Sequence, residues 1–160
     1  MTFKTLLLAA AAIAAPLALT AAPAHADGGV YVGGEGESSA VGGYDTVSYF
    51  QGDGVPVKGD ARFTVEYDGA QWHFANQENA DKFKADPGAF APQYGGHCAW
   101  ALGANGALAP GDPKVYKVVD GKLYLNFNKQ VQTMWLKDVP GFITKADFAW
   151  TDIPTGTRFG

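Results

Sequence analysis

Two hairpin signals of the same form constrain the fold of this chain more than any other feature. The first is FTVEY from Phe63, an Asp68-Gly69 turn and QWHFA, and the second is VYKVV from Val115, an Asp120-Gly121 turn and KLYLNF. β-branched and aromatic residues on both arms favour strands, and Asp-Gly is a preferred dipeptide of two-residue hairpin turns. The sequence therefore predicts two antiparallel β-hairpins.

A helix signal follows each hairpin. Asn76 and Asn128 stand where an N-cap is expected, apolar residues then recur at helical spacing, and Pro87-Gly88 and Pro140-Gly141 end the two patterns. One common shift along the sequence superimposes both the two turns and the two caps. We expect a single small α+β domain of two hairpin–helix units, in the pattern of an internal repeat, with their apolar faces packed together. A chance agreement of common turn and cap signals is the alternative.

The same shift shows two differences between the units. His73 aligns with Leu125, and nothing in the second unit corresponds to His97-Cys98, which lie in the segment YGGHCAWALGANG between the units. Glycines open this segment, so it is expected to form either a short helix or an irregular loop.

The segment 1–26 has the features of a cleavable export signal. Lys4 gives a positive start, an almost purely apolar run extends from Leu6 to Leu19, and Ala24-His25-Ala26 has the small-x-small pattern of a cleavage site. We expect the mature protein to begin at Asp27 and to be periplasmic or secreted. The apolar run is short for a bilayer span, so no membrane insertion is expected after cleavage, and an uncleaved N-terminal anchor is the alternative.

The remaining chain divides into three parts by composition. Residues 27–43 are rich in glycine and are predicted to be a flexible leader with almost nothing to bury, residues 44–153 an α+β domain, and residues 154–160 a tail. The formal net charge is −4 and the lysines are scattered, which argues against nucleic acid as a partner. The single cysteine, Cys98, excludes an internal disulfide. In an oxidising compartment its thiol must be buried, liganded, paired with another molecule or reactive.

Several motifs, taken in order, resemble the YHS-domain family, specifically its exported members with a GYD-x-V-x-YF opening and a YGG-x-C-A motif. They are GYDTVSYF from Gly43, PVKGD from Pro56, the long run from Phe63 to Gly96, and His97-Cys98-Ala99. The resemblance extends from about Gly43 to Ile153. It implies a compact α+β fold and kinship with small cysteine-based modules that bind heavy metals.

The chain departs from those metal-binding relatives at their cysteine positions. The relatives have one cysteine at the end of the second hairpin strand and another in the following helix. This chain has Phe74, Ala75 and Asn76 at the first position, and Ala80 and Phe83 in the helix. A thiolate-rich site therefore does not carry over to this chain, and the resemblance settles no activity.

Few soft metal ligands remain in the mature chain: His73, His97, Cys98 and Met134. Imidazole, thiolate and thioether groups together favour copper, with zinc less favoured, so we predict a metal site at His73, His97 and Cys98. Adjacent residues of a helix or strand point in different directions, so His97 and Cys98 can share an ion only on an irregular backbone. Gly95 and Gly96 could supply that irregularity.

Two other interpretations of Cys98 stay open. It is either a small buried apolar group in a structural or interaction module, or a reactive thiol activated by His97 or His73 in a thiol-dependent enzyme or redox protein. No GxSxG, CxxC or HExxH motif supports a better known reaction, so an enzyme is the less favoured class. The sequence predicts a small exported binding protein.

Tyr44, Asp45 and Tyr94 are predicted to bind a ligand or cofactor. Tyr44 and Asp45 follow the leader and precede the first hairpin, a position where polar aromatic groups commonly line a pocket. Tyr94 belongs to the YGG segment and is expected near the same place.

Overall fold

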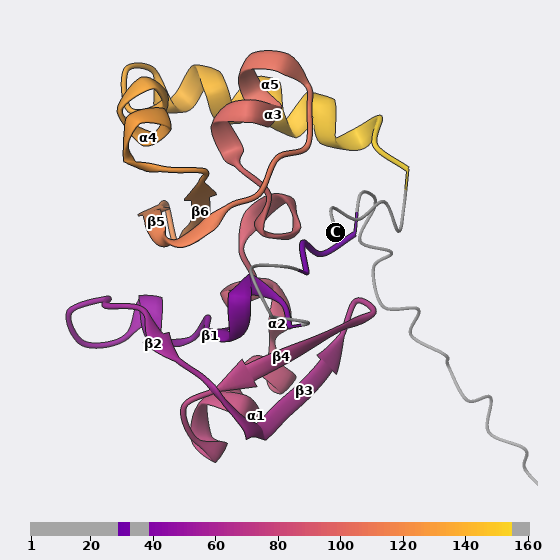
Figure 1. Ribbon diagram of the computed structural model, residues 1–160, viewed down its shortest axis with the longest axis vertical. Coiled ribbons are helices and arrows are strands. Elements are labelled where there is room, and N and C mark those ends of the chain that lie inside the picture. Colours follow the sequence, from indigo (N-terminus) through magenta and orange to yellow (C-terminus); the bar gives the residue numbers. More distant parts are fainter. Residues whose placement is uncertain (1–28, 33–38, 155–160) are drawn as a thin grey trace, which may run out of the picture.

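The computed structural model describes residues 29–32 and 39–154. The predicted export signal at 1–26 lies outside the described residues, as does the predicted tail beyond Pro154. The chain folds into two units, one above the other in the view of Figure 1. The lower unit comes from the first half of the domain and the upper unit from the second half. Helices and short antiparallel strands make up both, which confirms the predicted α+β class.

The first unit opens with the 3-10 helix η1 (Val41–Gly43), the short strand β1 (Tyr44–Asp45), the 3-10 helix η2 (Ser48–Phe50) and strand β2 (Val57–Lys58), which pairs with β1. The predicted hairpin follows as β3 (Asp60–Tyr67) and β4 (Ala70–Phe74). Asp68 and Gly69 have φ of 50° and 69°, as a two-residue turn with two left-handed positions requires. Helices α1 (Gln77–Ala85) and α2 (Pro87–Phe90) complete the unit, and the Asn76 side chain caps α1 by accepting the Asn79 N–H.

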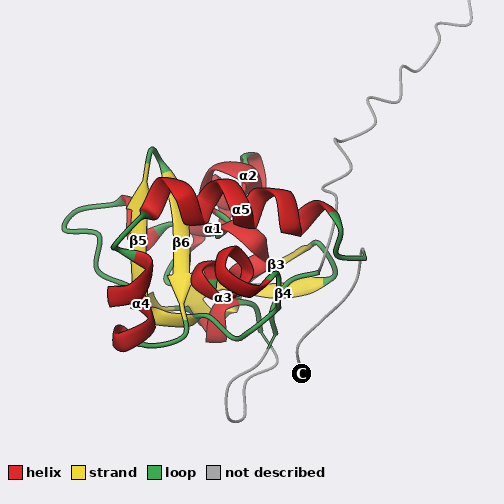
Figure 2. Cartoon of the chain, turned by 90° about the horizontal axis from the view of Figure 1, so that it is seen from above, coloured by secondary structure: helices red, strands yellow, loops and turns green. Residues whose placement is uncertain are grey.

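The second unit opens with η3 (Gln93–Gly96) and helix α3 (Ala99–Asn105), so the YGG segment contains both a glycine loop and a short helix. The second hairpin is β5 (Asp112–Val119) and β6 (Lys122–Asn126), with Asp120 and Gly121 at φ of 50° and 73°. Helices α4 (Lys129–Trp135) and α5 (Val139–Thr151) follow, and Asn128 caps α4 by accepting the Val131 N–H. In Figure 2, α5 extends across this unit, and it packs against α3.

The two hairpins agree in detail. The sequence shift that superimposes the two turns also brings both ends of β3 onto those of β5 and both ends of β4 onto those of β6. The register of each pair shifts at the same point, between Asp60 and Thr64 in the first and between Asp112 and Tyr116 in the second. Both predicted hairpins and both predicted caps are therefore present at the predicted spacing.

Helix α5 is an element that the sequence patterns did not predict. Pro140-Gly141 end the α4 pattern as expected, but they also lie in the first turn of α5, where the Asp138 side chain caps the helix by accepting the Gly141 N–H. Pro87 begins α2 in the same way. Proline is well suited to a first helical turn because its missing N–H has no intrahelical partner there.

Strand β6 joins the two apolar clusters of the protein. Leu123 and Leu125 belong to a cluster with Trp72, Phe74 and residues of the first unit. Tyr124 lies between them in sequence and belongs to a second cluster with Trp135, Ala146 and other residues of the second unit. Side chains alternate across a strand, so β6 is buried on both faces. The predicted packing of the units against each other is achieved through this strand.

Parts of the predicted leader are packed rather than exposed. Val30, Ala40 and Val41 are all buried and belong to the first apolar cluster. The Tyr31 N–H also donates to the Gly95 carbonyl at 2.8 Å. The expectation that this segment has almost nothing to bury is therefore wrong for these residues, because a few apolar side chains among many glycines are enough to close one side of the core.

Within the described residues, no helix combines the length and apolarity that crossing a bilayer would require.

Candidate functional site

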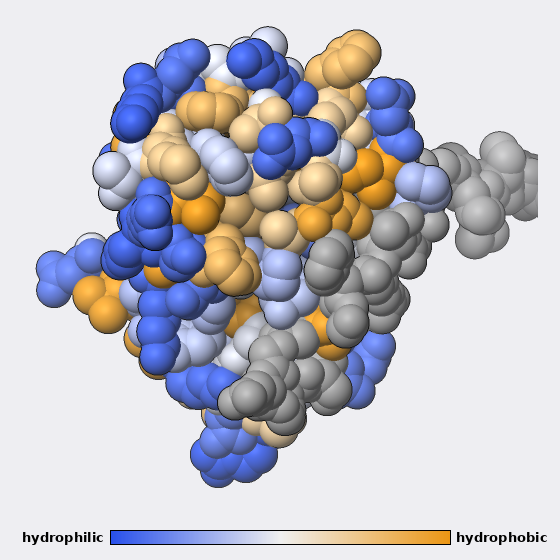
Figure 3. Space-filling model, turned by 45° about the horizontal axis from the view of Figure 1, so that its top comes forward, coloured by the Kyte–Doolittle hydropathy of each residue, from blue (hydrophilic) through white to orange (hydrophobic). Residues whose placement is uncertain are grey.

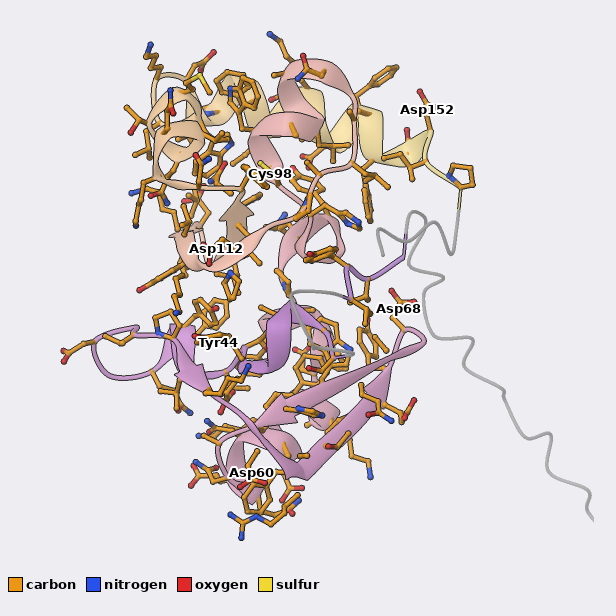
Figure 4. All side chains as sticks on the ribbon, in the orientation of Figure 1. Tyr44, Asp60, Asp68, Cys98, Asp112 and Asp152 are labelled. Atoms are coloured by element: carbon orange, nitrogen blue, oxygen red, sulfur yellow. The ribbon has the colours of Figure 1, made fainter. Side chains whose placement is uncertain are left out.

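Cys98 lies inside the second unit, at the N-terminus of α3 (Figure 4). It is fully buried, at 0% exposure. Its sulfur accepts the Phe127 N–H at 3.3 Å, and its S–H donates to Oδ1 of Asn126 at 4.0 Å. The Asn126 side chain is also fully buried, and its Nδ2 has no hydrogen-bond partner among the described residues. The thiol is thus both an acceptor and a donor of hydrogen bonds inside the fold.

His97 is equally buried but lies in different surroundings. Its Nδ1 is 2.7 Å from the Tyr94 carbonyl oxygen, and its ring packs near Tyr31 and Trp150. Burial is the main cause that lowers the pKa of the imidazole below its ordinary value, and the Tyr94 carbonyl opposes this effect. The structure therefore favours the neutral ring.

The backbone directs the side chains of His97 and Cys98 apart. His97 has φ −72° and ψ 160°, and Cys98 has φ −63° and ψ 114°, so both residues are extended. Consecutive extended residues place their side chains on opposite sides of the chain. The irregular backbone provided by Gly95 and Gly96 ends before His97, and the condition for a shared ion is not met in this conformation.

His73 lies in β4, in the other unit, opposite Thr64 of β3. Its neighbours Trp72 and Phe74 are buried in the core, so the half-buried His73 faces the other side of the hairpin. Among the residues that the structure describes, no three His, Cys, Asp or Glu side chains lie close enough to hold a metal ion. The predicted ligand set His73, His97 and Cys98 thus does not fit a metal ion in the arrangement described.

Asp45 is a buried structural acceptor. Its two carboxylate oxygens accept the backbone N–H groups of Val47, Ser48 and Ala75 and the side-chain amide of Asn79, at distances from 2.6 to 3.3 Å. The residue is 0% exposed. Its carboxylate ties the opening of the first unit to the end of β4 and to α1, and it faces neither of the two cavities described below.

Tyr44 and Tyr94 line two separate cavities, both of which lie between the units. Tyr94 borders a cavity of about 300 Å³ together with Trp72 of the first unit and Trp150 of the second. Its hydroxyl donates to Asp147 at 2.7 Å, and burial followed by this carboxylate raises the pKa of the phenol. Tyr94 therefore also anchors η3 to α5.

Tyr44 borders the second cavity, a groove of about 400 Å³. We call it the lysine–aromatic groove, and its lining residues are Tyr31, Gly42, Tyr44, Lys58, Pro110, Gly111, Asp112, Pro113, Lys114 and Phe127. Figure 4 shows Tyr44 and Asp112 on the same side of the junction, one in each unit. The groove brings Lys58 of the first unit together with Lys114 and Phe127 of the second. Lys58 lies in the PVKGD motif and Phe127 at the end of the second hairpin signal, but neither pattern indicates ligand binding. Only the pairing of the units could reveal them.

The charge of the groove differs from that of the whole protein. The formal net charge of the chain is −4, whereas the groove has two lysines and one aspartate. The Lys58 ammonium lies 5.2 Å from the centre of the Tyr44 ring and donates to the Gly42 carbonyl at 2.7 Å. Asp112 accepts the backbone N–H of Lys114 at 2.8 Å. Phe127 is 50% exposed, so an apolar ring is open to a ligand beside the two cations.

Comparison with known proteins identifies one family. Residues 51–94 match the model of the YHS domain. The chain matches no curated protein and no solved structure. The matched residues span β2, the first hairpin, α1 and α2, and they end at Tyr94.

The YHS domain is associated with metal binding. The matched segment contains no cysteine, and His73 is its single histidine. His97 and Cys98 lie beyond it. The predicted resemblance to the YHS-domain family is confirmed for residues 51–94, which match the model of its domain.

Proposed function

We propose that the protein is a small exported binding protein that holds a small organic anion with an aromatic or other apolar body in the lysine–aromatic groove. The observation that carries this proposal is the convergence of Lys58, Lys114 and the exposed Phe127 ring in one cavity between the units. The volume of about 400 Å³ is within the range of small-molecule sites.

The groove supplies recognition for both parts of such a ligand. The two ammonium groups attract a carboxylate or a similar anion, and a hydrogen bond to a charged group is stronger than one between neutral groups. The Tyr44 and Phe127 rings offer an apolar surface for the body of the ligand. Pro110 and Pro113 stiffen one wall, which lowers the ordering cost of binding.

A binding assay with matched ligands tests this function. Benzoate and indole-3-acetate are titrated into the mature protein by calorimetry, beside benzamide as a neutral analogue and acetate as an anion without a ring. We expect the aromatic acids to bind, with an affinity that falls as salt rises, and the two partial analogues to bind at least tenfold more weakly. Equal binding of benzamide and benzoate, or no binding of any aromatic acid, would refute the proposal.

Lysine variants locate the site. Lys58→Gln and Lys114→Gln each remove one charge from the groove and are expected to weaken benzoate binding by about 10-fold or more, the effect of losing one charged hydrogen bond. Lys117→Gln is the matched control, because Lys117 is an exposed lysine of the same strand as Lys114 and does not line the groove. A loss of affinity in Lys117→Gln equal to that in Lys114→Gln would place the ligand elsewhere.

A transition-metal ion, copper before zinc, is the second candidate ligand. The YHS match supports it, as does the short list of soft ligands in the chain, with His97 and Cys98 adjacent in sequence. It requires a conformation other than the one described, because these two side chains diverge. Titration of the mature protein and Cys98→Ser with Cu(I), Cu(II) and Zn(II) tests it. Tight binding that Cys98→Ser abolishes would support this candidate, and unchanged binding would remove the cysteine from it.

A further inference from the structure

The openings of the two units each contain three consecutive residues with positive φ. Val41, Gly42 and Gly43 have φ of 54°, 56° and 72°, and Tyr94, Gly95 and Gly96 have φ of 56°, 60° and 85°. Three consecutive left-handed residues are rare, and a non-glycine residue at the first of them is rarer still. Each run is followed by an extended residue, Tyr44 or His97, whose N–H donates back to the first residue of the run.

The strand contacts after each opening also correspond. Tyr44 pairs with Lys58 in the first unit, and His97 pairs with Pro110 in the second. Asp45 then pairs with Val57, and the Cys98 N–H donates to Ala109 at 2.8 Å.

The number of residues between opening and hairpin differs in the two units, so the sequence shift that aligns the hairpins does not align the openings. The strand partners keep the shift that relates the two hairpins, whereas the openings lie one position further apart. The second unit therefore has one residue fewer between its opening and its hairpin. His97-Cys98 are the start of the second unit and correspond to Tyr44-Asp45.

The side chains of Asp45 and Cys98 accept N–H groups at equivalent positions of the two units. Asp45 Oδ2 accepts the N–H of Ala75, the first residue after β4, at 2.9 Å. Cys98 Sγ accepts the N–H of Phe127, the first residue after β6, at 3.3 Å. We infer that Cys98 is the counterpart of Asp45 in a structural repeat and acts as a positioning residue, which fixes the end of the second hairpin, and Phe127 with it, rather than as a metal ligand or a reactive thiol.

The neighbours explain why sulfur can replace a carboxylate here. Asp45 also receives the side-chain amide of Asn79, which lies three residues after the Asn76 cap. The residue three after the Asn128 cap is Val131, which has no side-chain donor. A buried carboxylate at position 98 would have fewer donors than Asp45, and burying a charge without partners is costly. A neutral thiol needs fewer donors and still accepts the Phe127 N–H.

The consequence for function concerns the lysine–aromatic groove, and this part rests on the proposed function. The backbone of Phe127 is held by Cys98 from inside the second unit, while its ring lines the groove. Loss of the acceptor at position 98 would free the residue that follows β6 and loosen one wall of the groove. Cys98 would thus act on the ligand through Phe127, without contact.

Matched variants separate hydrogen bonding from side-chain volume. Cys98→Val keeps apolar volume but removes the acceptor, and Cys98→Ala removes both with little risk of a steric clash. Cys98→Ser loses apolar character but keeps an acceptor for the Phe127 N–H. The diagnostic measurement is amide hydrogen exchange of Phe127 without ligand, with the Ala75 amide of the first unit as the internal reference.

We expect Cys98→Ala and Cys98→Val to speed exchange at Phe127 by about fivefold or more relative to Cys98→Ser, the effect of one lost hydrogen bond. Exchange at Ala75 should not change. In the wild-type protein the thiol should react with an alkylating probe at least 100-fold more slowly than in urea, because the sulfur is buried. Equal exchange at Phe127 in all three variants, or fast alkylation of the folded protein, would overturn the inference.

Benzoate affinity of the same variants tests the link to the groove. We expect Cys98→Ser to bind like the wild type and Cys98→Ala to bind several-fold more weakly. If the wild type binds no aromatic acid, the proposed function fails, while the exchange data still decide the role of Cys98. If the wild type binds benzoate and Cys98→Ala binds it equally well, the link from Cys98 to the groove is refuted and the groove itself stands.

Discussion

At the scale of single residues, His73, His97 and Cys98 lie in three different environments. His73 faces away from the core, His97 packs among aromatic rings, and the Cys98 sulfur accepts a backbone N–H. Chemical identity made these residues candidates for one metal site. Backbone conformation and burial direct them to separate roles.

His97 makes stability depend on pH. Its pKa in the folded protein is lowered, mainly by burial, so the unfolded chain takes up a proton more readily than the folded one. Above about pH 6.5, the ordinary pKa of histidine, the protonation of His97 does not lower the free energy of unfolding. As the pH drops below this value, the free energy of unfolding falls. Urea unfolding at pH 7.5 and 5.5 measures this. We expect His97→Gln to reduce the difference in the free energy of unfolding between the two pH values. An identical pH dependence in wild type and His97→Gln would contradict the assignment.

At the scale of elements, matching local signals build matching structure. Asn76 and Asn128 cap α1 and α4 with nearly the same backbone angles, φ −157° and ψ 170° against φ −159° and ψ 175°. Sequence patterns predicted both hairpins and both of these helices because each depends on local turn and cap chemistry. They missed α5 because Pro140-Gly141 resemble a stop, although proline is equally favourable in a first helical turn.

The two caps should contribute similarly to stability. Replacing either asparagine by alanine leaves an N–H at the first turn without its acceptor, which typically costs about 1 kcal/mol. We expect Asn76→Ala and Asn128→Ala each to lower the free energy of unfolding by about this amount in urea titrations. Gln77→Ala, one residue inside α1, is the control and should change little. A cost in only one of the two variants would show that the units are not equivalent at their caps.

A close approach between α3 and α5 depends on Gly103. A Cβ atom at this position would clash with the backbone of Phe142 in α5. We expect Gly103→Ala to destabilise the protein by about 1–3 kcal/mol despite the better helix propensity of alanine, because the helices would have to move apart. Gly88→Ala in α2 is the control, since its Cβ would meet only ordinary contacts. Thermal unfolding measures both, and equal melting temperatures of Gly103→Ala and the wild type would contradict this packing argument.

At the scale of the whole molecule, the pairing of the two units creates both the core and the cavities. β6 gives Leu123 and Leu125 to one cluster and Tyr124 to the other, and both cavities are lined by residues from each unit.

The surface shown in Figure 3, with the second unit turned toward the viewer, mixes hydrophobic and hydrophilic residues. Phe148 and Leu136 of this unit are exposed at 74% and 48%.

We also predict that the full chain is exported and cleaved. Expression of the full chain in a bacterium with a periplasm is expected to give a protein that begins at Asp27, because signal peptidase cleaves after a small-x-small sequence. Intact mass measurement of the periplasmic fraction checks the cleavage site. Ala24→Leu and Ala26→Leu should block processing. A protein that retains Met1 and stays with the membrane fraction would instead support the uncleaved anchor.

The sequence alone determined the local elements of this protein and its resemblance to the YHS domain. Alternating apolar residues, Asp-Gly turns and asparagine caps act over a few neighbours, so their consequences can be recognised without knowing the fold. Tertiary structure decided which side chains meet. It separated His73 from His97 and Cys98, buried part of the glycine-rich segment, and brought Lys58 beside Phe127. These outcomes depend on how the two units pack through β6. That packing is stabilised by many weak contacts between residues far apart in the chain, which local sequence patterns do not reveal.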